Sequence, residues 1–156
     1  MSISDMIVVM KLGVLQQIGK PQEVYDDPVN LFVAKFLGTP PINVFEGKVS
    51  GGKLYLGDAA VLDVPGVADQ EVYVGIRPEG FQLDANGALK CKLSNVEVMG
   101  RDVSIVSTNE ASINPVVRSI IDADNKVDLS QEYVSYCVKP HKVFIFNKET
   151  EERVYF

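Results

Sequence analysis

The sequence has few of the residues from which catalytic and metal sites are built. Its 156 residues include no tryptophan, one histidine and two cysteines. His141 has no cysteine or carboxylate at ligand spacing, which is typical of a surface residue rather than a base or a metal ligand. Cys91 and Cys137 lie far apart among alternating apolar residues, which indicates reduced thiols in the protein interior and a reducing compartment. We therefore expect no catalytic or metal constellation.

Long hydrophobic runs and basic clusters are also absent. The longest apolar run, Met6 to Met10, is far shorter than the roughly 18 residues that cross a bilayer, and no signal segment precedes a cleavage site. The net charge of −6 and the pI of about 4.8 disfavour binding to phosphate backbones. We expect a globular protein that does not span a membrane, is not exported and has no nucleic-acid partner.

One glycine pair raises the question of nucleotide binding. The stretch Ser50-Gly51-Gly52-Lys53 resembles a signature turn, and the residues from Gly52 fit the first part of a phosphate loop. Asp58-Ala59, however, stands where that loop needs Lys and then Ser or Thr. The flanking residues alternate as in two short strands, and a Gly-Gly pair between such strands is typical of a hairpin turn. We interpret the pair as a turn.

Residues 1–41 are predicted to form a hairpin followed by two short helices. The hairpin pairs residues 6–10 with residues 14–19, and Gly13 supplies the positive φ of a tight turn. Its strands are apolar on both faces, as in strands inside a larger sheet. The first helix starts at Pro21, and the second is predicted to have Asp27 as its cap, Pro28 at its first position and its end at Gly38.

From residue 42 onward the pattern alternates with a period of two, which predicts an all-β module. Val72, Val74 and Ile76 should face a core in one strand, and Val134, Tyr136 and Val138 in another. Turn signals separate the strands and suggest a small barrel. The predicted strands are 44–49, 54–56, 71–77, 89–99, 103–108, 113–121, 132–139, 143–146 and 153–156. The expected turn residues are Gly51-Gly52, Asn86-Gly87, Gly100 to Asp102, and the aspartates 58, 63, 69, 84, 122, 124 and 128.

Two strand ends share one form, in which a cation, a proline and a polar residue follow the strand. They are Gly75-Ile76-Arg77-Pro78-Glu79 and Cys137-Val138-Lys139-Pro140-His141. A proline ends a strand because it offers no N–H to the ladder. We interpret the pair as two equivalent exits from a barrel; the alternative is that the barrel grew from two related halves.

Three blocks, in order, carry a resemblance to a known family. They are residues 6–49, residues 72–83, which include "GIRPE", and residues 136–154, which include "VKPHKVFIF". Together they resemble the C-terminal half of the ATP-binding subunits of ABC transporters of the maltose and multiple-sugar type. The motif residues that match the family are Gly75, Ile76, Arg77, Pro78 and Glu79, followed by Lys139 and Pro140, and we expect their role to be structural. His141 departs from the acidic residue that family members often carry.

The resemblance implies a mainly β fold: an oligonucleotide/oligosaccharide-binding (TOBE) β-barrel preceded by a β-hairpin and two short α-helices. Residues 1–41 would be the end of the ATPase domain and residues 42–156 the regulatory barrel. The family's phosphate loop, signature turn, catalytic glutamate and switch histidine lie upstream of the point equivalent to Met1. The chain is therefore expected to be a truncated form that neither binds nor hydrolyses ATP, with ATP and Mg²⁺ as cofactors of the full-length parent only.

The resemblance also implies partners and a location. Barrels of this family pair with each other, the parent subunit sits on permease subunits at the inner face of the cell membrane, and some members bind cytoplasmic regulators. Apart from the resemblance, the exposed edges of the residue 6–18 hairpin predict self-association through it. The alternative function is a free-standing barrel that binds a small oxyanion or a sugar.

Overall fold

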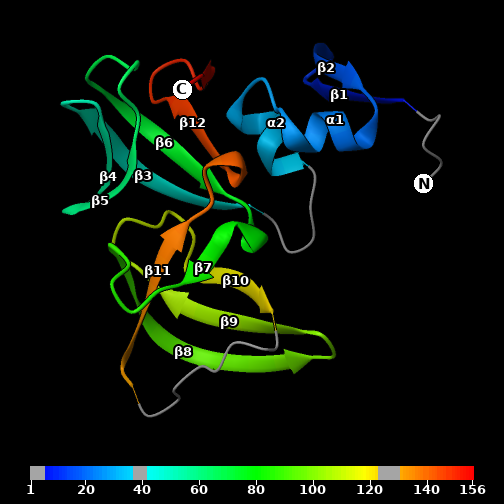
Figure 1. The fold of residues 1–156 in the computed structure, drawn as a ribbon. Coiled ribbons are helices and arrows are strands. Elements are labelled where there is room, and N and C mark those ends of the chain that lie inside the picture. The colour runs from blue at the N-terminus through cyan, green and yellow to red at the C-terminus, as the bar shows by residue number, and fades with distance from the viewer. Residues whose placement is uncertain (1–5, 37–41, 123–130) are drawn as a thin grey trace.

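The computed structural model describes residues 6–36, 42–122 and 131–156, without the side chains of Met99 and Asp122. The chain begins with the hairpin of β1 (Ile7–Lys11) and β2 (Val14–Gly19), followed by α1 (Pro21–Asp26) and α2 (Leu31–Phe36). Two antiparallel sheets follow, and in Figure 1 the helices lie between the hairpin and the sheets. No described helix has the length and apolar content that crossing a membrane requires.

The sheet next to the helices has six strands in the order β13-β12-β6-β3-β4-β5. Its members are β3 (Asn43–Ser50), β4 (Lys53–Leu56), β5 (Ala59–Asp63), β6 (Gln70–Ile76), β12 (Val143–Asn147) and β13 (Arg153–Val154). The turn between β3 and β4 contains Gly51 and Gly52, both at positive φ. The predicted hairpin turn at this glycine pair is confirmed.

The second sheet has five strands in the order β10-β9-β8-β11-β7. Its members are β7 (Phe81–Leu83), β8 (Leu89–Met99), β9 (Asp102–Thr108), β10 (Val117–Asp122) and β11 (Tyr133–Val138). Two short 3₁₀ turns, η1 (Pro78–Gly80) and η2 (Pro140–Lys142), carry the chain between the two sheets.

The main core lies between the two sheets. The predicted inward residues of β6 and β11 are all buried there, which confirms the strand phase in both cases. Strand β12 is buried on both faces, because Val143 and Ile145 enter the main core while Phe144 and Phe146 pack under α2. This explains its unbroken apolar sequence.

A polar seam brings the two sheets together into a nearly closed barrel. The loop after β9 is hydrogen-bonded to the free edge of β3. Glu46 N donates to Ala111 O (2.8 Å), and Ile113 N donates to Val44 O (2.9 Å). The side chain of Asn43, which is 2% exposed, donates to Ile76 O and Arg118 O and accepts from Arg118 N. The predicted class, a mainly β barrel preceded by a hairpin and two short helices, is confirmed.

Two predicted element starts are wrong by several residues, and two strands were not predicted. Asn30 caps α2, because its side chain accepts from Val33 N at 2.9 Å, so neither Asp27 nor Pro28 lies in that helix. The strand predicted from residue 113 begins at Val117, since Pro115 has no N–H to pair. The short strands β5 and β7 lacked a clear alternation. The predicted turn residues Asp63, Asp102 and Asp122 lie in strands β5, β9 and β10. The predicted helix end at Gly38 and the turn residues Asp124 and Asp128 lie outside the described residues.

Candidate functional site: the junction of the helices and the barrel

The motif residues found in the sequence come together at one place, where the chain crosses between the sheets. Gly75 and Ile76 end β6, and Arg77 precedes η1; Lys139 precedes η2 in the same way. The two crossings lie side by side, because Arg77 N donates to Lys142 O (3.1 Å) and Lys139 N donates to Gly80 O (2.8 Å). The interpretation as two equivalent strand exits agrees with this arrangement.

The two crossings form one continuous antiparallel ladder. In the six-stranded sheet β6 pairs with β12, with Ile76 opposite Val143. In the five-stranded sheet β7 pairs with β11, with Phe81 opposite Val138. The register does not shift between these pairs, so the ladder passes through both 3₁₀ turns from one sheet into the other. The origin of the barrel from two related halves stays a prediction.

The Gly75 backbone is closely packed at this point. A Cβ at Gly75 would lie 2.8 Å from Cδ1 of Ile42, which belongs to the cluster under α2. A larger residue at this position would have to displace the end of the Ile42 side chain.

Arg77 joins both helices to the barrel. It is 1% exposed, and its guanidinium donates to Ala34 O (2.9 Å) and to Tyr25 O (2.8 Å). These carbonyls lie in the last turns of α2 and α1, where backbone acceptors have no partner within the helix and a cation is favourable. One arginine thus caps the C-terminal ends of two helices. Burial lowers the pKa of Arg77, and the neighbouring Tyr25, Glu79 and Asp26 oppose that shift.

Tyr25 lies against Arg77 and Glu79. Its ring centre is 3.9 Å from the Arg77 guanidinium carbon, and its hydroxyl donates to Glu79 Oε2 at 2.6 Å. Burial first, and then the bond to Glu79, raise the pKa of Tyr25 well above its ordinary value. Lys142 adds a cation at 3.7 Å from Glu79. Two residues of the first motif therefore hold a tyrosine of the first helix.

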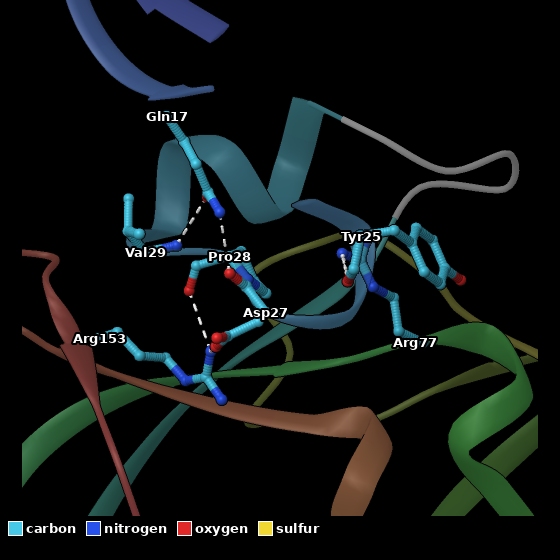
Figure 2. A network of polar contacts seen from close by, with 7 residues as sticks. All are labelled: Gln17, Tyr25, Asp27, Pro28, Val29, Arg77 and Arg153. Atoms are coloured by element: carbon cyan, nitrogen blue, oxygen red, sulfur yellow. Dashed lines mark hydrogen bonds and ion pairs between the residues drawn. The ribbon is translucent and has the colours of Figure 1, made fainter. Parts of the chain in front are cut away.

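A second arginine holds the segment between the helices. Arg153 donates to Asp27 Oδ1 (2.8 Å) and to Pro28 O (3.0 Å), as Figure 2 shows. Its guanidinium carbon also lies 4.7 Å from the ring centre of Phe144. Asp27, predicted as a helix cap, is therefore an ion-pair partner of the barrel.

The same segment reaches the hairpin from its other side. Gln17 on β2 donates to Asp27 O (3.1 Å) and accepts from Val29 N (3.0 Å) (Figure 2). Asn30 donates to Gln16 at 2.8 Å and forms a bridge with Glu152. Residues 27–30 thus touch the hairpin on one side and the barrel on the other.

Tyr25, Asn43 and Arg153 were not predicted as members of this junction. Their partners lie 33 to 126 residues away along the chain, and no local period marks such contacts. The adjacency of a cation and a proline at the strand ends was the usable signal, and it located Arg77, Glu79 and Lys139 but not the helix residues that Arg77 and Glu79 contact.

The single histidine and the two cysteines differ in their exposure. His141 is exposed on η2, Cys91 is buried, and Cys137 is half-buried; both thiols are free. In residues 6–36, 42–122 and 131–156, no group of three or more His, Cys, Asp and Glu side chains is placed to hold a metal ion.

Comparison with known proteins points to one kind of protein. Residues 43–83 match the family described as the CysA C-terminal regulatory domain. The chain is similar to the oligosaccharides import ATP-binding protein MsmX of Bacillus subtilis (strain 168), with 33% identity over 99% of this chain and 46% of that protein. It is also similar to the sn-glycerol-3-phosphate import ATP-binding protein UgpC of Jannaschia sp. (strain CCS1), with 39% identity over 64% of this chain and 29% of that protein.

A third relative is the putative ABC transporter ATP-binding protein MG187 of Mycoplasma genitalium (strain ATCC 33530 / DSM 19775 / NCTC 10195 / G37). The identity is 33% over 99% of this chain and 26% of that protein. The chain spans less than half the length of these curated relatives.

Proposed function

The chain belongs to the C-terminal regulatory region of ABC-transporter ATP-binding proteins, and we propose that it is the dimerising and regulatory part of a subunit that energises sugar uptake. The observation that carries the proposal is the similarity of nearly the whole chain to an oligosaccharide import protein. In this chain the similar region consists of the hairpin, the helices and the barrel, in that order. The junction around Arg77 supports it, because it ties the hairpin and the helices firmly to the barrel.

We assign residues 1–41 to the end of an ATPase domain and residues 42–156 to the regulatory barrel. The small core of Val9, Val24 and Val33 joins the hairpin to the helices and is separate from the core between the sheets. The two parts meet at α2 and at the junction. A boundary near residue 41 is consistent with that division.

The proposed role does not include ATP hydrolysis by this chain. The motifs of an ABC ATPase lie outside the region to which the chain corresponds. The glycine pair Gly51-Gly52 lies in a hairpin turn, whereas a phosphate site needs the free N–H groups of a helix N-terminus. Calorimetric titration with ATP and Mg²⁺ should give no saturable heat, and tight saturable binding would contradict the assignment.

Self-association is the part of the proposal that the hairpin supports. On its outer face Val8 pairs with Ile18, and Met10 pairs with Leu15. These four side chains are 49% to 57% exposed and form a contiguous apolar surface. Exposed apolar surface with free strand edges favours a partner, and we propose a second copy of the chain.

Leu15→Lys tests that interface. The lysine places a charge at the centre of the outer face, so a dimer formed there should dissociate, as measured by sedimentation velocity over a range of concentrations. Val98→Lys is the matched control, because Val98 is 77% exposed on β8, away from the hairpin. A wild-type chain that stays monomeric, or a dimer that Leu15→Lys leaves intact, refutes assembly through the hairpin; a dimer that persists points to the barrel instead.

The remaining partners and the location follow from the proposed subunit. We propose a cytoplasmic position at the inner face of the membrane, with permease subunits and a cytoplasmic regulator as partners of the full-length parent. Co-purification of the full-length subunit with its permeases, compared with the same subunit carrying Arg77→Lys, tests whether the junction is needed in that assembly.

A free-standing ligand-binding module remains the second candidate function. One observation favours it, namely an open cleft on the barrel that is lined by charged, hydroxyl and aromatic groups.

A further inference from the structure

We infer that this cleft binds a neutral oligosaccharide. The cleft has a volume of about 590 Å³ and lies between the β4–β5 turn and the strands β8 and β11. Figure 1 shows β4 and β5 on the same side of the molecule as β11. Its size is within the range of small-molecule sites, roughly 300–1,000 Å³. The inference rests on the second candidate function, which depends on the same cleft, and names its ligand class; it does not depend on the proposed dimerising role.

Three side chains in a row form one wall of the cleft. Lys92 on β8 lies opposite Thr108 on β9 and opposite Tyr133 on β11. Lys90 follows on the same face of β8, because Leu89 and Cys91 point into the core. Tyr133 is 55% exposed, so an aromatic face is available beside two ammonium groups and a hydroxyl. An aromatic face with adjacent hydrogen-bonding groups suits the apolar face and the hydroxyls of a sugar ring.

Two carboxylates in the cleft favour a neutral ligand. Asp58 in the β4–β5 turn and Glu110 after β9 line the same cleft and balance the two lysines. A carboxylate accepts hydrogen bonds from hydroxyl groups, but it repels a phosphate. The chain as a whole carries a net charge of −6, which disfavours a polyanion further. The lining therefore favours an uncharged polyol over a sugar phosphate or a nucleic acid.

The loop that carries Glu110 is held in place by Asn109. The Asn109 amide donates to Lys90 O (2.9 Å), and its oxygen accepts from Ala111 N (2.8 Å). The loop is thus tied to the strand that bears both lysines. A site held by such bonds keeps its shape before a ligand arrives.

A second cleft of about 300 Å³ extends the site past the turn. It shares Gly57 and Asp58 with the first cleft, and there Lys48 lies 5.9 Å from the ring centre of Tyr55. A tyrosine and a lysine therefore flank Asp58 on each side. This repetition fits a ligand of several sugar units better than a single sugar.

An NMR titration of the ¹⁵N-labelled chain tests the inference with maltotriose as the probe. We expect saturable shifts of the Lys92, Thr108 and Tyr133 amides with a millimolar Kd. Tyr133→Ala should weaken binding about tenfold. Lys90→Ala, which changes an exposed residue, should weaken it as well. Tyr155→Ala is the control and should leave the Kd unchanged, because Tyr155 is 62% exposed and does not line either cleft.

Several outcomes overturn the inference. They are the absence of saturable shifts, shifts confined to other residues, and an equal loss of affinity in Tyr155→Ala. Tighter binding of glucose 6-phosphate or of a thymidine oligonucleotide than of maltotriose would assign the cleft to an anion. None of these outcomes bears on self-association, which tests the proposed function. The sugar-binding inference and the proposed function can therefore fail separately.

Discussion

The guanidinium carbon of Arg77 lies 3.9 Å from the centre of the Tyr25 ring, and the same guanidinium donates to the Tyr25 carbonyl. One residue of the barrel thereby holds a helix residue by its ring and by its backbone. With the bond to Ala34 O, this contact fixes both helices against the sheet. The stability of the junction should depend on the shape of this side chain as well as on its charge.

Arg77→Lys should lower the free energy of unfolding by about 2 kcal/mol, since lysine keeps the charge but has neither the planar fork nor the stacking face of arginine. Urea unfolding followed by circular dichroism measures the change. Arg118→Lys is the control at an exposed arginine and should stay within about 0.5 kcal/mol of the wild type. Equal effects at the two positions would show that Arg77 has no special role.

Gly87→Ala should destabilise the barrel strongly. A Cβ at this position would lie 2.2 Å from the carbonyl oxygen of Tyr136, which is backbone of β11, a strand that pairs with a neighbour on each side. We expect a loss of about 3 kcal/mol or more of unfolding free energy. Gly66→Ala is the matched control, because no atom lies within 4 Å of its Cβ position. Similar melting temperatures for the two variants would contradict the close approach.

Asn43→Asp should open the seam between the sheets. The variant loses the two donated bonds to Ile76 O and Arg118 O and brings a carboxylate close to those carbonyl oxygens. We expect a loss of about 2 to 3 kcal/mol, with faster hydrogen exchange at the Arg118 amide than at the Val72 amide in the centre of the sheet. Uniform acceleration at both amides would indicate global destabilisation without a local opening.

The stability of the chain should fall at alkaline pH because of Cys91. Burial raises the pKa of this thiol from 9.0 to about 11 in the folded chain. Between these values the unfolded chain loses the thiol proton while the folded chain keeps it. The contribution of Cys91 to the free energy of unfolding is therefore complete below pH 9 and is lost as the pH rises to 11. The loss of unfolding free energy over this range is about 2 to 3 kcal/mol.

Urea unfolding of Cys91→Ala over the same pH range checks this prediction, since its curve should be flatter than that of the wild type. Val134→Ala is the control, because Val134 is buried opposite Cys91 and does not titrate. It should lower stability and keep the wild-type slope. Burial also raises the pKa of Tyr136 to about 12, so a further decline above pH 10 should remain in every variant.

Strand phase and the glycine turns could be predicted from the sequence because both are local. The alternation in β6 and β11 identified the inward side chains, and Gly51-Gly52 identified a hairpin turn. Gly87 is a different case. The sequence marked it as a turn residue, whereas the structure requires a glycine there because the Tyr136 backbone passes so close.

The junction could be predicted only in part. Arg77 stood out because of the proline after it, but the residues that it contacts are set by the packing of α1 and α2 on the sheet. The start of α2 illustrates the limit, since Asp27 and Asn30 are both good caps by residue type. In the structure Asn30 caps the helix and Asp27 pairs with Arg153. Long-range partners of this kind have no signature in a single sequence.

The ladder that joins β6 and β7 to β11 and β12 has a consequence for how the chain folds. Its pairs are separated by 67 residues at Ile76 and Val143, and β11 and β12 each take a place between two other strands. Neither sheet can be completed until the segment after residue 131 has emerged from the ribosome, because β8 lacks one neighbour and β6 another until then. Closing so large a loop is slow. Chains that stall before this segment should expose two unfinished sheets and attract chaperones.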